Sequence, residues 1–154
     1  MRFLVAFVLA LVPHIALADL APRAGWEVVP TQKTFDQLVA DTRAAVKANG
    51  MIVVTQAGPT KAAKARGIDI PGNRVIGVFN NQFAVRVLRL SEAAMIEAPI
   101  RLYVTENDDE TATLSYKTPT HVFAPYIAQA GKELADEASK LDQVFAAIAQ
   151  DALK

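Results

Sequence analysis

Two neighbouring stretches of the chain alternate between apolar and polar residues, and this pattern constrains the fold more than any other feature. Every second residue is apolar from Ile100 to Thr105 and again from Thr111 to Lys117. A period of two is typical of strands that bury one face and leave the other wetter. The acidic link 107–110 between the two stretches is short enough for a β-hairpin. A sheet that contains this hairpin cannot be purely parallel.

The chain before the hairpin alternates between strand patterns and helix patterns. Short apolar or β-branched runs predict strands at 26–29, 51–55 and 74–79. Apolar residues at helical spacing, with start and stop signals, predict helices at 34–50, 58–67 and 81–98. The resulting order is strand-helix-strand-helix-strand-helix-strand-strand-helix. This order predicts a two-layer α+β domain, with a mostly antiparallel sheet covered by helices and a C-terminal helix.

The end of the chain predicts a short helical piece followed by a long helix. Residues 121–126 are expected to form a short helical piece or a turn, because Pro125 disfavours a long helix there. Beyond them, apolar residues four or three apart trace one stripe along a helix at about 131–152: Leu134, Ala138, Leu141, Phe145, Ile148 and Ala152. The stripe either packs on the sheet or forms a self-association surface. We favour sheet packing, because the matched flanking charges of a coiled coil are missing.

Residues 1–18 have the pattern of a secretory signal peptide: a basic start, an uncharged apolar run and a small-residue end. The apolar run is shorter than the ~20 residues of a membrane span, and Pro13 and His14 interrupt it. We therefore predict cleavage before Asp19 and a periplasmic or secreted protein without a stable membrane anchor after cleavage. Residues 19–154 then form a single domain, since this length suits one hydrophobic core.

Charge and cysteine content exclude several classes of partner and chemistry. The chain has 16 basic and 16 acidic residues, so it offers no overall basic field, and we expect no nucleic-acid partner. Lys61, Lys64 and Arg66 make one helix cationic, which we interpret as a solvated face rather than an anion site. The absence of cysteine excludes disulfides, thiol redox chemistry and thiolate-bound metals. Stability must therefore come from packing.

The chain contains no phosphate loop, dinucleotide fingerprint or nucleophile elbow. His121 is the only histidine that remains after cleavage. It would serve as a general base with Tyr116 or Tyr126, or as an axial haem ligand with Met51 or Met95. The simpler interpretation is that His121 caps or packs the turn that contains it. We identify no catalytic residue.

Two further polar residues complete the candidate ligand-binding set. Asn80 ends a strand, where it would orient a polar ligand or cap the next helix. Arg86 lies on that next helix. The candidates are Asn80, Arg86, Tyr116, His121 and Tyr126. The acidic cluster 106–110 lacks the alternating ligands and central glycine of a calcium loop, so we predict no metal site and no cofactor.

Several short motifs, taken in order, resemble a known family. They are Thr34–Leu38 (TFDQL), Ala62–Gly67 (AAKARG), Val78–Asn80 (VFN), Ala98–Arg101 (APIR) and Leu114–Pro119 (LSYKTP). Their order and spacing resemble the bacterial domain of unknown function 302 (DUF302) over about 34–126, ahead of the helix at about 131–152. The resemblance implies a compact α+β fold with an antiparallel sheet, often paired as a homodimer, and brings no agreed activity. Asn81 stands where members often have proline, and Glu110 where a glycine often closes the hairpin.

The functional expectation rests on the well-patterned core and on the lack of a catalytic constellation. We expect an exported, noncatalytic domain that binds a small ligand or acts as an accessory protein, and that associates as a homodimer. One alternative is a small enzyme that uses His121 with Tyr116 or Tyr126. Another alternative is a metal or haem carrier.

Overall fold

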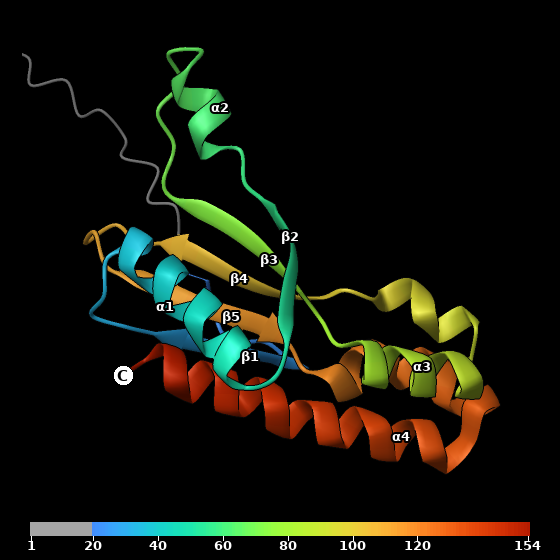
Figure 1. Ribbon diagram of the computed structural model, residues 1–154. Coiled ribbons are helices and arrows are strands. Elements are labelled where there is room, and N and C mark those ends of the chain that lie inside the picture. Colours follow the sequence, from blue (N-terminus) through green and yellow to red (C-terminus); the bar gives the residue numbers. More distant parts are fainter. Residues whose placement is uncertain (1–19) are drawn as a thin grey trace, which may run out of the picture.

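The computed structural model describes residues 20–154 (Figure 1). The predicted signal peptide, residues 1–18, lies outside the described residues. The strands are β1 (Trp26–Pro30), β2 (Ile52–Ala57), β3 (Asn73–Phe79), β4 (Ile100–Glu106) and β5 (Ala112–Lys117). The helices are α1 (Phe35–Ala48), α2 (Thr60–Lys64), α3 (Asn81–Leu90) and α4 (Pro119–Ala152), with the 3-10 helix η1 at Ala93–Glu97. No helix in the described part of the chain is long and apolar enough to span a membrane.

The five strands form one antiparallel sheet in the order β1-β5-β4-β3-β2. The predicted hairpin is its centre: β4 pairs with β5 in a register that places Leu102 opposite Tyr116. β1 pairs with the other edge of β5, although β1 comes first in the chain. The predicted α+β fold with a mostly antiparallel sheet and a C-terminal helix is confirmed.

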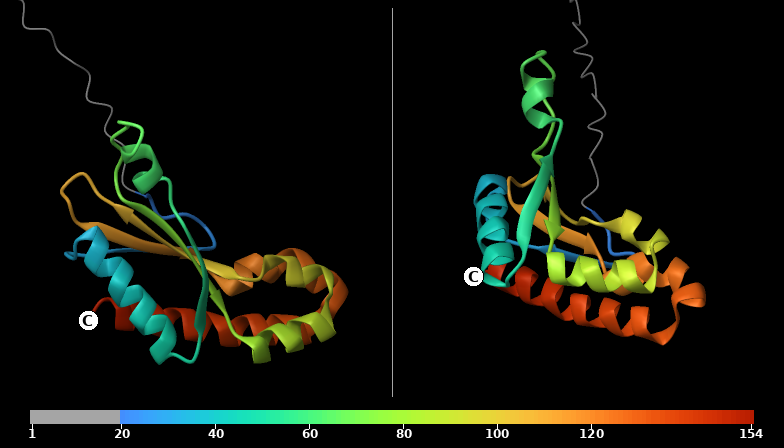
Figure 2. Two further views of the ribbon diagram at one scale, coloured as in Figure 1. Left: turned by 45° about the horizontal axis from the view of Figure 1, so that its top comes forward. Right: turned by 45° about the vertical axis from the view of Figure 1, so that its right-hand side comes forward.

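One face of the sheet is covered by helices. Figure 2 shows α1 and the later part of α4 side by side along this face, and the two helices contact each other. Leu102, Val104 and Leu114 point into this layer and are 0% exposed. The six residues of the predicted helix stripe are all buried in the chain's own core, at most 3% exposed. The stripe therefore serves the core, and it does not form an exposed self-association surface.

The opposite face of the sheet, here called the open face, carries the alternate residues of the same strands. Register and alternation place these side chains on it: Trp26, Val28, Val75, Arg101, Tyr103, Ser115 and Lys117. Arg101 is exposed, whereas its neighbour Leu102 is fully buried. The expected contrast between a covered and a wetter face thus holds along β4.

The helix predicted at 81–98 is broken in the structure. α3 ends at Leu90, Ser91 is extended (φ −159°, ψ 111°), and η1 begins two residues later. The Ser91 hydroxyl accepts a hydrogen bond from the Ala94 N–H at 3.1 Å, so it starts the second helical segment. The prediction of one continuous helix was wrong, because Ser91 competes locally for backbone hydrogen bonds.

The short helical piece expected at 121–126 is present, but it is longer than expected, because it begins at Pro119 and passes Pro125. α4 begins at Pro119, where the Thr118 hydroxyl accepts from the His121 N–H, and it continues past Pro125. The backbone is non-helical at Gly131 (φ 76°, ψ −166°), which separates this piece from the long helix expected at about 131–152. Burial of Phe123 in the core, at 3% exposure, holds the helix in place despite the backbone hydrogen bond that proline removes.

The segment from β2 through α2 to β3 forms an arm that projects from the body (Figure 1). Its strands pair antiparallel, and a bulge between Val53 and Thr55 shifts their register. Lys61, Lys64 and Arg66 on the arm are all exposed to solvent.

Candidate functional site

A cleft of about 620 Å³ lies on the open face and extends to the first turns of α4. This volume is within the range of ~300–1,000 Å³ that is typical of small-molecule sites. Strands β1, β3, β4 and β5 contribute to it, and so do η1 and α4. The lining residues are Trp26, Asn73, Val75, Glu97, Ile100, Arg101, Tyr103, Tyr116, Lys117, His121, Val122 and Pro125.

Tyr116 lines one end of the cleft but belongs mainly to the core. It is 4% exposed, and its ring lies 5.6 Å from that of Phe145 at a tilted angle of 52°. Burial, assisted by the negative charges of Glu27 and Asp142, raises the pKa of Tyr116 to about 12. The phenol therefore stays protonated at neutral pH, where it can donate a hydrogen bond and cannot act as a base.

His121 also lines the cleft, with its ring against the backbone of Gly25. A Cβ atom added to Gly25 would lie 2.1 Å from His121 Nδ1, so only glycine leaves room for the ring. Gly25 also has a φ of 75°, in the left-handed region that favours glycine. His121 thus packs against Gly25, outside the turn that contains it, and it also borders the cleft.

Tyr126 does not line the cleft, but it contacts a residue that does. Its hydroxyl donates a hydrogen bond to Glu97 Oε1 at 2.7 Å. This bond is the main cause of a raised pKa for Tyr126, with smaller contributions from burial and the charge of Glu97. The pair joins α4 to η1 and fixes one wall of the cleft.

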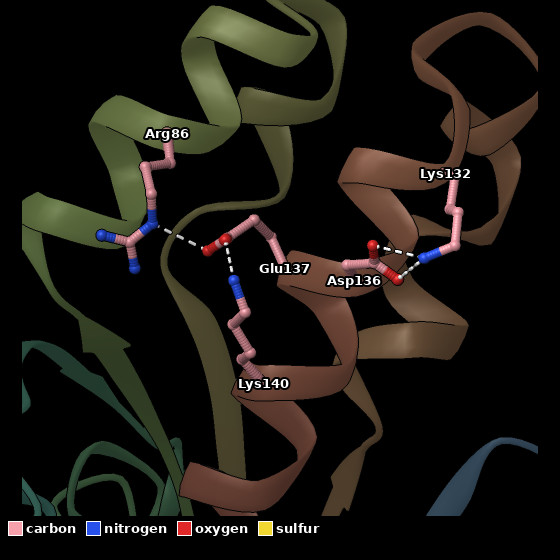
Figure 3. Close-up of polar contacts among 5 residues, drawn as sticks. All are labelled: Arg86, Lys132, Asp136, Glu137 and Lys140. Carbon is pink, nitrogen blue, oxygen red and sulfur yellow. Dashed lines mark hydrogen bonds and ion pairs between the residues drawn. The ribbon is translucent and has the colours of Figure 1, made fainter.

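Arg86 lies away from the cleft and joins α3 to α4 (Figure 3). Its Nε donates to Glu137 Oε2 at 2.7 Å, and Lys140 Nζ donates to Glu137 Oε1 at 2.6 Å. Burial alone would raise the pKa of Glu137, which is 7% exposed, but the hydrogen bonds and charges of Lys140 and Arg86 outweigh burial and lower it. The geometry gives Arg86 a structural role.

Asn80 has a structural role as well. Its side-chain oxygen accepts from the N–H groups of Gln82 and Phe83, which caps α3. Its side-chain amide donates to the Gly50 carbonyl at 2.9 Å. Both ends of the side chain are therefore used, as in the capping interpretation.

The residues of the haem hypothesis do not come together. Met51 and Met95 line a separate apolar cavity beside α3, of about 30 Å³, whereas His121 lines the cleft on the open face. Within residues 20–154, no group of three or more His, Cys, Asp or Glu residues is placed to hold a metal ion.

Apart from Tyr116, sequence reasoning missed the cleft residues on the strands. Arg101 and Tyr103 carry a usable signal, because they are the polar positions in the alternation of β4. Trp26 and Lys117 pair across β1 and β5, which lie 91 positions apart in the chain, so no local pattern connects them. Lys117 Nζ lies 5.7 Å from the centre of the Trp26 ring.

Comparison with known proteins identifies the family of this fold. The sequence model described as "Domain of unknown function DUF302" matches residues 27–149. The chain belongs to the DUF302 family. The crystal structure of an uncharacterized conserved DUF302 protein from Bacillus stearothermophilus is similar, with a TM-score of 0.74 and 20% sequence identity. The match covers 86% of this chain and 100% of that one, and it shows the shared fold. None of the curated proteins matches this chain.

The two departures from the DUF302 pattern fit the structure. Asn81 is the first residue of α3, a position where proline is well tolerated in a helix. Glu110 has a φ of 65°, in the left-handed region that a glycine adopts without strain. The hairpin of this DUF302 protein therefore keeps the backbone conformation that glycine would favour.

Proposed function

We propose that this DUF302 protein is a noncatalytic domain that binds a small molecule in the cleft on the open face. The observation that carries the proposal is the cleft itself, about 620 Å³ in volume and lined by aromatic and cationic side chains around a sheet floor. Trp26 and Tyr103 offer flat apolar surface, and Asn73 and Glu97 offer polar groups. This mixture is typical of ligand sites.

The protonation and hydrogen bonds of the tyrosines in and beside the cleft favour ligand binding over acid–base catalysis. The phenol of Tyr116, with a pKa raised to about 12, is protonated at neutral pH. The Tyr126 hydroxyl donates a hydrogen bond to Glu97, and the His121 ring packs on Gly25. A general base must reach a substrate proton within hydrogen-bond distance. Neither tyrosine offers a free basic atom, so the enzyme alternative would rest on the exposed ring of His121 alone and has weaker support.

We also propose that the protein is exported and acts as a homodimer. Export is supported by the signal-peptide pattern of residues 1–18, and dimerisation by the resemblance to the DUF302 family. We expect the protein recovered from the cell envelope to begin at Asp19 and to have twice the mass of one chain. Intact mass spectrometry and light scattering measure these quantities. An uncut chain would contradict export, and a strict monomer would contradict the dimer.

Trp26 provides a direct test of cleft binding, because it is the only tryptophan in the chain and it lines the cleft. In a ¹⁵N-labelled protein it gives one indole N–H resonance. We expect a panel of aromatic and aliphatic fragments, added at millimolar concentration, to contain members that shift this resonance together with the backbone N–H of Arg101 and Lys117.

A matched pair of variants separates the cleft from the rest of the surface. Val75→Phe places a larger side chain in the cleft, whereas Val85→Phe makes the same change on α3, where the side chain is 39% exposed. We expect Val75→Phe to weaken fragment binding by about tenfold, and Val85→Phe to leave it unchanged. Equal binding by both variants, or no fragment that shifts Trp26, would overturn the proposed function.

A further inference from the structure

Two positive side chains lie next to each other on the floor of the cleft without a negative partner. Leu102 pairs with Tyr116 across β4 and β5, so Arg101 and Lys117 occupy the next position on each strand. Both are exposed and both line the cleft. Like charges on neighbouring strands repel each other and destabilise a sheet. Among the described residues, neither side chain forms an ion pair.

The other charged groups around the cleft compensate this positive charge only in part. Glu97 is the one acidic residue of the lining, and its carboxylate accepts the hydrogen bond of Tyr126. A further cation, Arg23, lies over the Trp26 ring at 5.2 Å, and Lys117 lies over the same ring at 5.7 Å. The cleft is therefore locally cationic in a chain whose total charge is balanced.

The backbone at the start of α4 does not supply an alternative anion site. The N–H of Thr120 donates to Asp142 Oδ1, that of His121 to the Thr118 hydroxyl, and that of Val122 to the Thr118 carbonyl. These groups are satisfied within the chain. A negative ligand in the cleft would be held by the side chains of β4 and β5.

An apolar surface continues directly from the two cations. Register places Tyr103 opposite Val75 on β3, and both line the cleft one step along the open face from Arg101. Trp26 on β1 pairs with Lys117 on β5, so Trp26 lies on the side of Lys117 that faces away from β4. A molecule with an acidic group at one end and a flat or aliphatic body would meet both kinds of surface at once.

We infer that the cleft selects small organic carboxylates, with the acid group held by Arg101 and Lys117 and the apolar body on Trp26, Tyr103 and Val75. This inference rests on the proposed function, since it names the ligand class of the same cleft. A bound carboxylate would offset the repulsion between Arg101 and Lys117. Guanidinium and ammonium groups both form charge-assisted hydrogen bonds with carboxylates.

Pairs of probes that differ only in charge test the inference. The first pair is 3-phenylpropionate and 3-phenylpropionamide, and the second is octanoate and octanamide. Binding is measured from the Trp26 indole N–H shift. We expect each carboxylate to bind the natural protein about tenfold or more tightly than its amide. Arg101→Gln combined with Lys117→Gln is expected to remove this preference to within about twofold.

The control variant carries the same charge change at a distance from the cleft. Arg43 and Lys47 are exposed on α1, which lies on the covered face, and Arg43→Gln with Lys47→Gln should keep the full preference for carboxylates. Thermal unfolding gives an independent measurement, because removal of Arg101 alone should maintain or raise the unfolding midpoint by relieving repulsion. A lower midpoint for Arg101→Gln would contradict repulsion between Arg101 and Lys117.

The outcomes distinguish this inference from the proposed function. Equal binding of acid and amide to the natural protein would overturn the carboxylate inference and leave cleft binding intact. Retention of the carboxylate preference in the Arg101/Lys117 variant would also overturn it, because another group would then hold the acid. If neither member of either pair shifts Trp26, and the fragment panel also fails, both proposals are wrong.

Discussion

Replacement of Phe145 by alanine is expected to lower the free energy of unfolding by about 3–5 kcal/mol, the largest single effect we predict. Phe145 is 0% exposed in the later part of α4, and its ring contacts that of Tyr116 across the interface between helix and sheet. Alanine would leave a cavity under β5, since close-packed neighbours relax only in part. Urea unfolding followed by circular dichroism measures the change.

Leu153→Ala is the matched control for Phe145→Ala. Leu153 follows the same helix and is 37% exposed, so its truncation should change the free energy of unfolding by less than about 1 kcal/mol. Equal effects at the two positions would contradict the assignment of the α4 stripe to the core. The Phe145 variant should also lower the pKa of Tyr116, because burial is the first cause of its raised value.

Replacement of Gly58 by alanine is expected to destabilise the protein by about 1–3 kcal/mol, because there is no room for a side chain at this position. An added Cβ would lie 2.1 Å from the carbonyl oxygen of Asn73, which is backbone and cannot rotate away. The side chain of Asn73 donates a hydrogen bond to the hydroxyl of Tyr103, and both residues line the cleft. The variant should therefore also shift the Trp26 indole resonance.

Gly67 gives a contrasting control on the same arm. An added Cβ at Gly67 meets nothing within 4 Å, but the φ of 74° lies in the left-handed region. Gly67→Asn should cost little, because asparagine tolerates this region, whereas Gly58→Asn should be as harmful as Gly58→Ala. Thermal unfolding of the three variants separates the two causes. A stable Gly58→Ala variant with an unchanged Trp26 signal would contradict the close approach to Asn73.

Local patterns were sufficient where side-chain burial follows the period of one element. Leu134 and Phe145 were placed on one helix face from their spacing, and both are 0% exposed. Ile100 and Leu102 were placed on the covered face of a strand by the alternation with Arg101. These predictions succeed because one continuous face of each element is buried.

Local rules gave the wrong answer where two signals competed. The apolar spacing of 81–98 predicted one helix, but the Ser91 hydroxyl captures the Ala94 N–H and starts a new segment. Pro125 predicted a shorter first piece of α4, but that piece, with Phe123 buried, continues to the break at Gly131. In both cases the spacing of apolar residues was present, and the hydrogen bonds and packing of particular side chains decided the outcome.

The candidate binding residues show the limit of a single sequence most clearly. Of the five, Tyr116 and His121 line the cleft, Tyr126 supports its wall through Glu97, and Asn80 and Arg86 stabilise α3. An isolated polar residue gives the same signal whether it binds a ligand, caps a helix or forms an ion pair. Its partners in the fold decide between these roles.

The sequence by itself determined the types and order of most elements, the central hairpin, the buried stripe of the last helix and the family. The tertiary structure alone decided the cleft, because its lining extends from Trp26 to Pro125 and depends on β1 joining the far side of β5. The physical reason is that periodicity is a local property, which indicates only which face of one element is buried. Strand order and register decide which distant side chains share a face.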